Sequence, residues 1–269
     1  MRPNSFTSIR GRVPKLPSFL LGLVPIIVLL AIWWYATSGP AEYRAVSPTI
    51  LPSPVEVLSS APELVNRREL FHHARVSLVR VAAGFGAAVV VVVPLAVLMG
   101  AFGLPRSMFA PVTTASGYIP IATLVPLTMA WFGTDEKQKI VFLAMAFAVY
   151  LLPMVLKAVD NVPEVYLRTS YTLGSSRLQT IFKVLIPVAM PDIWHGMRLA
   201  FGVGWTYLVL AEVVDMQYGL GALVEISRRR GPREHIYLVI LTITLIAWMA
   251  DLLWAYAGHL MFPYRRSKT

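Results

Sequence analysis

The stretch AAGFGAAVVVVVPLAVLMG, residues 82–100, carries no charged side chain. A run of this length, in helical form, spans the hydrocarbon core of a bilayer, which takes about 20 apolar residues. A continuous helix also satisfies its own backbone hydrogen bonds, as lipid requires. The stretch therefore predicts a transmembrane helix, which we place at residues 76–102. Gly84, Gly86, Ala87 and Ala88 would let neighbouring helices approach it closely.

The composition extends this prediction to the whole chain. Of 269 residues, 57% are hydrophobic and 14% are charged, whereas soluble domains are about 45–50% apolar and about 25% charged. We expect an all-α integral membrane protein with one transmembrane domain, residues 16–260. Its helices, about six in number, are expected at residues 16–36, 76–102, 108–132, 138–159, 193–214 and 235–260.

Basic residues set the expected orientation. Basic residues precede the first apolar run and aromatic residues end it: Arg2, Arg10, Arg12 and Lys15, then Trp33, Trp34 and Tyr35. Because this run is long enough to span, we interpret it as an uncleaved helix and not a signal peptide. Lys and Arg are enriched in cytoplasmic loops, so we expect the tails 1–15 and 261–269 to be cytoplasmic. The basic residues in 228–233 argue against this orientation.

Absent motifs exclude several classes of function. The net charge of +10 fits anionic headgroups, and no basic run is interleaved with aromatic residues, so we expect no nucleic acid. The chain has no cysteine, its five histidines lack metal-ligand spacing, and no phosphate-binding glycine loop occurs. We therefore expect neither an enzyme nor a chain with its own cofactor or metal.

The expected third helix, residues 108–132, contains helix breakers. Pro111, Gly117, Pro120 and Pro126 fall within it. Broken helices in membranes occur where they face protein or a water-filled path. The residues favour two interpretations equally, a pore lining or kinks that aid packing. The candidate residues of a translocation path are Thr113, Tyr118, Pro120, Trp205 and Glu212.

Ionisable residues within predicted spans are costly and often functional. We expect Arg198 to extend to the inner membrane surface. Glu212 is expected to form a structural ion pair with Arg75 or Arg80, with a gating role as the alternative. Asp251 is interpreted as a polar contact between helices, as a protonated carboxyl, or less readily as a substrate contact.

The segment 160–191 is too polar to span. Pro163 suits a helix start, and Gly174 suits its end. Ser175 or Ser176 can cap a second short helix, which we expect Pro187 and Pro191 to end before the fifth span. Two short helices would form a surface knob that docks in a partner. An ordinary amphipathic loop resting on lipid is the alternative.

This segment resembles the cytoplasmic signature of ATP-binding-cassette importer permeases. That signature is Glu-Ala-Ala, three residues, Gly, nine residues, then Ile-x-Leu-Pro. It falls on residues 168–170, Gly174 and residues 184–187, with Arg168 in place of the glutamate. Further short matches at residues 51–57, 77–85, 131–133, 196–205 and 211–221 are similar to the nitrate, sulfonate, taurine and bicarbonate branch.

The resemblance implies a type I importer permease fold in a bacterial inner membrane. It implies two permease copies, identical or related, two cytoplasmic ATPases that hold ATP and Mg, and an external substrate-binding protein. The substrate would be a small anion such as nitrate, a sulfonate, taurine or bicarbonate. The ATPase-coupling residues would be Glu164, Arg168, Gly174, Arg177, Lys183 and Pro187. A stand-alone channel or secondary transporter is the alternative function.

Overall fold

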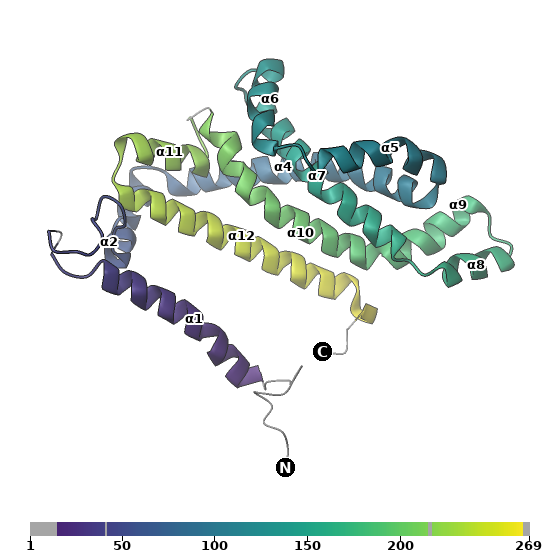
Figure 1. The fold of residues 1–269 in the computed structure, drawn as a ribbon, viewed down its shortest axis with the longest axis horizontal. Coiled ribbons are helices and arrows are strands. Elements are labelled where there is room, and N and C mark those ends of the chain that lie inside the picture. Colours follow the sequence, from purple (N-terminus) through teal and green to yellow (C-terminus); the bar gives the residue numbers. More distant parts are fainter. Residues whose placement is uncertain (1–14, 41, 215–216, 266–269) are drawn as a thin grey trace, which may run out of the picture.

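The computed structural model describes residues 15–40, 42–214 and 217–265 (Figure 1). Every regular element in these residues is a helix, which confirms the all-α prediction. The α-helices are α1 (Lys15–Ala36), α2 (Pro54–Ser59), α3 (Ala61–Asn66), α4 (Leu70–Ala101), α5 (Gly103–Ser116), α6 (Leu124–Phe132), α7 (Glu136–Asp160), α8 (Glu164–Thr172), α9 (Arg177–Thr180), α10 (Ile186–Val213), α11 (Leu220–Arg230) and α12 (Arg233–Met261). Short 3₁₀ and π segments complete them: η1 (Ile121–Thr123), the π-helix η2 (Ile181–Leu185) and η3 (Pro263–Arg265).

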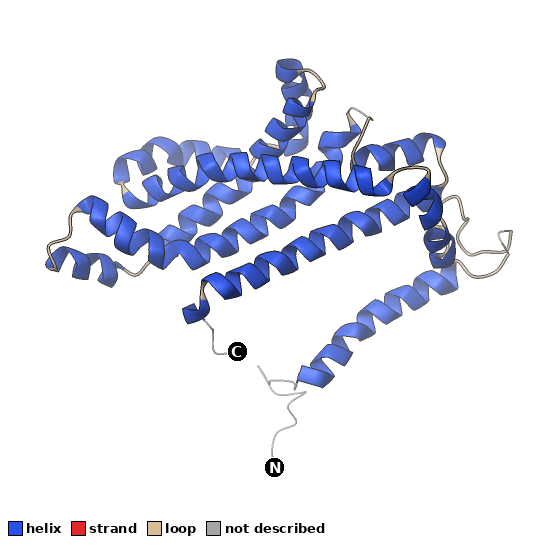
Figure 2. Ribbon diagram, turned by 180° about the vertical axis from the view of Figure 1, so that it is seen from behind, coloured by secondary structure: helices blue, strands red, loops and turns tan. Residues whose placement is uncertain are grey.

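Three long helices, α4, α7 and α10, form the centre of the molecule. α7 packs against α4 and α10, while α12 packs against α10 and α11. Figures 1 and 2 show α8 and α9 at one end of this bundle, with α2 and α11 at the other. α1 stands apart from the long helices, and its Trp33 indole donates a hydrogen bond of 2.9 Å to the Pro52 carbonyl.

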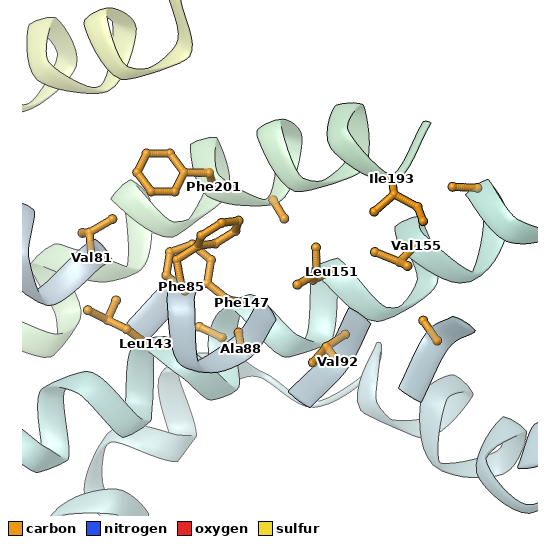
Figure 3. Packing of buried hydrophobic residues seen from close by; sticks show 14 of the residues in the cluster. Val81, Phe85, Ala88, Val92, Leu143, Phe147, Leu151, Val155, Ile193 and Phe201 are labelled. Atoms are coloured by element: carbon orange, nitrogen blue, oxygen red, sulfur yellow. The ribbon is translucent and has the colours of Figure 1, made fainter. Parts of the chain in front are cut away.

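The core is a cluster of apolar side chains repeated every three or four residues, the spacing of one helix face. Figure 3 shows residues of this cluster from α4, α7 and α10: Val81, Phe85, Ala88, Val92, Leu143, Phe147, Leu151, Val155, Ile193 and Phe201. The Phe85 ring meets Phe147 and Phe201 edge to face, with both centroid distances at 5.1 Å. This geometry suits the quadrupoles of aromatic rings.

Glycines allow the central helices to come this close. A Cβ added at Gly84 would lie 2.7 Å from the Leu143 Cβ, and one at Gly204 would lie 2.0 Å from the Phe147 ring. Both distances are shorter than van der Waals contact. Of the small residues in the second span, Gly84 and Ala88 are buried and serve helix packing as expected in lipid, whereas Gly86 and Ala87 are exposed.

Three described helices are long and apolar enough to cross a membrane, namely α4, α7 and α12. They confirm the spans predicted at 76–102, 138–159 and 235–260. The apolar part of α1, Leu20–Ala36, is shorter. The helix of the predicted fifth span, α10, begins at Ile186 and not near residue 193. The chain is thus a multi-pass membrane protein, while the total of six spans stays a prediction.

The third predicted span is broken into two pieces. The segments Gly103–Ser116 and Ile121–Phe132 are together long and apolar enough to span, but the chain bends by 90° between them. The break falls at Gly117 and Pro120, where Pro120 takes an extended ψ of 104°. Proline lacks the N–H that would continue the helix, and its ring disfavours a helical residue before it. The expectation that helix breakers interrupt this segment is therefore confirmed, and its crossing of the membrane as one broken span stays a prediction.

The segment expected to be a loop after the fifth span contains a helix, α11. One face of α11 is buried, including Leu220, Ala222 and Leu223. Leu220 and Leu223 join Val57, Leu64 and Val239 in a second apolar cluster. This cluster holds α2, α3, α11 and the start of α12 together.

A glycine pair on α4 tests the packing account. Gly84→Ala is expected to cost about 1–3 kcal/mol of stability, the usual penalty of overpacking. Gly86→Ala is the matched control, because a Cβ at Gly86 meets nothing within 4 Å. Thermal unfolding in detergent measures both variants. Equal melting temperatures for the two would contradict close packing of α4 on α7.

Candidate functional site

The first helix of segment 160–191 has the predicted start and end. α8 begins after Pro163, and Gly174 follows it with a φ of +80°. The Gly174 amide donates to the Tyr171 carbonyl at 3.0 Å, and the Ser175 amide donates to the Ser170 carbonyl at 3.1 Å. These two bonds form a Schellman motif, in which glycine takes the left-handed position without steric cost.

The second helix starts as predicted but does not end as predicted. Ser176 accepts a hydrogen bond from the Gln179 amide, and the Gln179 side chain accepts one from the Ser176 amide. From this capping box the helix runs without a break through η2 into α10. Pro187 and Pro191 therefore do not close it. The chain widens to π geometry just before Pro187, which relieves the clash that a proline ring makes with the carbonyl four residues earlier.

Polar contacts hold the two short helices and their base together. The buried hydroxyls of Ser170 in α8 and Thr180 in α9 lie 3.0 Å apart. At the base, Arg106 binds the Asp160 carboxylate through two hydrogen bonds of 2.8 and 2.7 Å. This pair ties the start of α5 to the end of α7. We name α8, α9 and the turn between them the knob.

The knob carries Glu164, Arg168, Gly174 and Arg177 of the predicted coupling residues, and Lys183 and Pro187 follow it in the chain. Glu164 and Arg168 form an exposed ion pair of 2.5 Å one helical turn apart. Arg177 lines a cavity of about 360 Å³ between the knob and the α4–α5 junction. Lys183 and Pro187 are exposed on η2 and α10. The knob also exposes large apolar side chains: Val165, Tyr166, Tyr171, Leu173 and Leu178.

The candidate path residues fall into two groups. Thr113, Tyr118 and Pro120 lie at or near the break of the third span, where the Tyr118 side chain is 83% exposed. Trp205 and Glu212 lie on α10 and are buried. The Trp205 indole nitrogen has no hydrogen-bond partner in the described part of the chain. Whether these residues contact a substrate stays a prediction.

Glu212 belongs to a buried charge network at the end of the bundle opposite the knob. Arg80 donates to Glu212 at 2.8 Å and, from the same nitrogen, to the Tyr218 carbonyl at 2.7 Å. A second edge of the Arg80 guanidinium binds Glu136 of α7, with one bond at 2.7 Å. The interpretation of Glu212 as the partner of Arg80 is confirmed. The role of Glu136 was missed, because the sequence places it in a polar turn.

The same network caps α11. Its first amides need acceptors, and other helices supply them. The Gly221 amide donates to Glu212 and the Leu220 amide donates to the Ser77 hydroxyl, both at 2.8 Å, while the Gly219 amide donates to His73 at 3.0 Å. His73 and Ser77 lie on α4, more than 140 residues away, whereas Glu212 on α10 is nine residues from Gly221.

A second ion pair links α10 and α12. Arg198 of α10 binds the Asp251 carboxylate of α12 through two hydrogen bonds of 2.6 Å. The expectation that Arg198 extends to the inner membrane surface stays a prediction, while its ion pair with Asp251 was not foreseen. The interpretation of Asp251 as a polar contact between helices is confirmed, and its partner satisfies the charge that lipid would not.

The basic run at the end of α11 is partly neutralised. Glu225, with a side chain 7% exposed, binds Arg228 at 2.6 Å and Arg229 at 2.6 Å. The hydrogen bonds from Arg228 and then Arg229 lower the pKa of Glu225 to about 2. This one carboxylate offsets one of the four positive charges in residues 228–233, so the run that argued against the expected orientation stays basic.

Arg80 offers a stability test. Arg80→Leu leaves Glu212 buried without a cation, which costs about 3–5 kcal/mol for a buried pair. Arg75→Leu, an exposed arginine on the same helix, is the control. Thermal unfolding in detergent should separate the two, and Arg80→Leu with Glu212→Gln should recover part of the loss. An Arg80→Leu protein as stable as the control would contradict the network's role.

Glu225 offers a pH test. Its pKa is lowered on folding, so its ion pairs contribute stability above the unfolded-state pKa of about 4.3. That contribution is lost as pH falls from about 4.3 toward about 2. The stability difference between the native protein and Glu225→Gln should therefore be constant from pH 8 to 5 and shrink below it. A difference that persists unchanged at pH 3 would refute the ion pairing.

Comparisons with known proteins place the chain in a family. Residues 92–257 match the family described as "Binding-protein-dependent transport system inner membrane component". The taurine transport system permease protein of Escherichia coli (strain K12) is 30% identical over 91% of this chain and 89% of its own length. The nitrate import permease protein of Synechocystis sp. (strain ATCC 27184 / PCC 6803 / Kazusa) is 27% identical, over 92% and 90%.

A solved structure shares the fold. An inward-facing form of the MetNI methionine ABC transporter superposes with a TM-score of 0.61 and 18% identity, covering 69% of this chain and 92% of that chain. The match shows the type I importer permease fold. The family match and the relatives favour an importer permease over the alternative of a stand-alone channel or carrier. The chain therefore belongs to the binding-protein-dependent transport system inner membrane components, the permease subunits of ATP-binding-cassette importers.

Proposed function

We propose that two copies of this permease form the translocation path for a small anion, driven by ATP hydrolysis on separate chains. The observation that carries the proposal is the knob at the head of α10. A rigid docking element continuous with a central helix can move that helix when a partner moves. ATP and Mg would bind the partner, and this chain would contribute no cofactor or metal site of its own.

The course of the helices supports the proposed orientation. α10 runs from the knob to α11, and α12 returns from α11 toward the knob end (Figure 1). α1 ends near α2, and α2 packs on the start of α12. Lys15, where α1 begins, and Met261, where α12 ends, therefore both lie away from α2 and α11. Together with the basic tails, this supports both termini and the knob on the cytoplasmic side.

The substrate class rests on the relatives. Their names give taurine, aliphatic sulfonates and nitrate, all small molecules with an oxyanion. We extend this class, with bicarbonate, to the present chain. An external binding protein would deliver the anion to the end opposite the knob. Thr113 and Tyr118 beside the break at Pro120 are the proposed contacts in the path. The Tyr118 hydroxyl can donate to an oxyanion, and that of Thr113 would first have to release its 2.8 Å hydrogen bond to the Ala110 carbonyl.

The ATPase contact is proposed to be apolar at its centre. Leu173 and Leu178 flank the turn at Gly174 and are 80% and 64% exposed. Arg168 stands where the resembled signature has glutamate, but it is paired with Glu164. Glu164 thus keeps one carboxylate on the knob surface, one helical turn earlier. An apolar anchor with a charged rim is the usual anatomy of a protein interface.

The knob offers a direct test of the proposal. Leu173→Asp with Leu178→Asp should abolish ATP-driven uptake and co-purification of an ATPase, because two charges would enter the apolar contact. The fold should persist, since both side chains are exposed. Tyr43→Asp, at a side chain 84% exposed far from the knob in the chain, is the control. Normal uptake by the double variant would refute docking through the knob.

A further inference from the structure

Two tyrosines meet between the central helices. Tyr150 of α7 and Tyr207 of α10 are half-buried, and their hydroxyl oxygens lie 2.7 Å apart. Both rings pack against the apolar core, with 6.0 Å between their centroids. The pair belongs neither to the knob nor to the charge network around Arg80. Its two hydroxyls are therefore polar groups at the edge of an apolar core, without a role in either site described above.

The hydroxyls lie near the middle of the membrane. A Cβ at Gly204 would meet the Phe147 ring, so these two residues mark the level at which α7 and α10 pass each other. Phe147 follows the first residue of α7 by eleven positions, which is about 17 Å along the helix. Half of the hydrocarbon core measures about 15 Å. The level of Phe147 is therefore close to the middle of the bilayer.

The direction of helical side chains brings both hydroxyls to this level. Tyr150 follows Phe147 by three positions, and Tyr207 follows Gly204 by three. α7 runs toward the knob and α10 runs away from it, so the two tyrosines start on opposite sides of the level. Side chains on a helix lean toward its N-terminus. Each tyrosine therefore leans back toward the level, where the hydroxyls meet.

The tyrosines border a face that the described helices leave open. On α10, one helix face presents, at intervals of three or four residues, Leu199, Val203, Tyr207 and Leu210. Leu199 and Leu210 are exposed, and Val203 is half-buried. On α7, the residue that follows Tyr150 by three, Pro153, is exposed as well. A lipid-facing position would place polar hydroxyls in hydrocarbon, which is costly. A water-filled path between two copies is the better environment for them.

The pair leaves one proton without an acceptor. Each phenol has one O–H, and the bond between the two hydroxyls uses one of the two protons. Neither hydroxyl makes another hydrogen bond within the described part of the chain. The tyrosine that accepts the bond from its partner keeps its own proton, and the accepted bond makes it a stronger donor. A solute with an oxygen lone pair can accept this proton.

The pair carries no charge, which suits an anion that must leave again. Arg80 is bound by two glutamates and Arg198 by Asp251, so neither guanidinium carries an uncompensated charge. A conducting site must bind its ion well enough to admit it and weakly enough to release it. An unpaired arginine at mid-membrane would hold an anion too tightly. A phenol O–H attracts the anion through a single hydrogen bond.

We propose that the hydroxyl pair of Tyr150 and Tyr207 binds the oxyanion of the substrate at mid-membrane during its passage. This inference rests on the proposed function, because it assigns a contact within the translocation path. One tyrosine donates to its partner, and the partner donates to an oxygen of the anion. Either tyrosine can take either role. The group recognised is a small oxyanion such as nitrate or a sulfonate.

Phenylalanine variants separate anion binding from a purely structural bond. The measurement is ATP-driven uptake of nitrate and of taurine by the permease, assembled with its ATPase and binding protein in proteoliposomes. A bond that only ties α7 to α10 is lost in either single variant, so the double variant would be no worse. Anion binding predicts stepwise losses, because Tyr150→Phe and Tyr207→Phe each keep one donor. The double variant should lose about tenfold in uptake, the effect of one hydrogen bond to a charged group.

Tyr237→Phe is the matched control. The Tyr237 hydroxyl donates to the Ile50 carbonyl at 2.7 Å, at the end of the bundle opposite the knob. The control therefore also loses one tyrosine hydrogen bond, and it should take up both anions as the native protein does. The rings stay in all variants, so each should fold. Uptake by the double variant equal to that of either single variant would overturn the proposal.

A second measurement uses the permease alone and does not depend on transport. Tyrosine is isotopically labelled at Cζ, and the single variants assign the nuclear magnetic resonance signals of Tyr150 and Tyr207. Both signals should shift on titration with sodium nitrate or sodium methanesulfonate. That of Tyr237 should not, because its proton already has an acceptor. Signals of the pair that stay in place would overturn the proposal. Shifted signals in a native protein that transports neither anion would support the site and refute the proposed substrate class.

Discussion

The arrangement of the central helices depends on one buried guanidinium. Arg80 is 2% exposed and contacts carboxylates from two other helices. Taking these charges from water is expensive, and separating them without water would cost more. α4, α7 and α10 are therefore fixed to one another at one end by charge, and the same carboxylate of Glu212 caps α11. At the knob end, the described residues contain no buried ion pair between α4, α7 and α10. Apolar packing holds the three helices there, and the knob continues directly into α10.

The predictions that succeeded rest on local signals. α4, α7 and α12 were predicted because their apolar runs are long and uninterrupted, so hydropathy alone indicates them. α8 and the start of α9 were predicted from Pro163, Gly174 and the serines that follow, whose backbone preferences act within a few residues. The assignment of Glu212 to Arg80 needed only the cost of an unpaired charge in lipid.

The predictions that failed depend on residues far apart in the chain. α11 was expected to be a loop because its caps come from Ser77, His73 and Glu212 on other helices. The partner of Arg198 was missed because Asp251, 53 residues away, shows no signal of contact in a single sequence. At Pro187 the propensity rule was overridden by a π segment, whereas at Pro120 the same rule correctly indicated the break in the third span.

The π-helix η2 has a consequence for how such chains can vary in evolution. Its hydrogen bonds reach one residue further than those of an α-helix, so one turn accommodates an extra residue. A deletion of a single residue within 181–185 would let this turn return to α geometry, while α10 and the knob keep their relative direction. The same deletion in a regular α-helix would rotate the two parts by about 100° around the axis. The segment can thus absorb a change in length of one residue without turning the knob relative to α10.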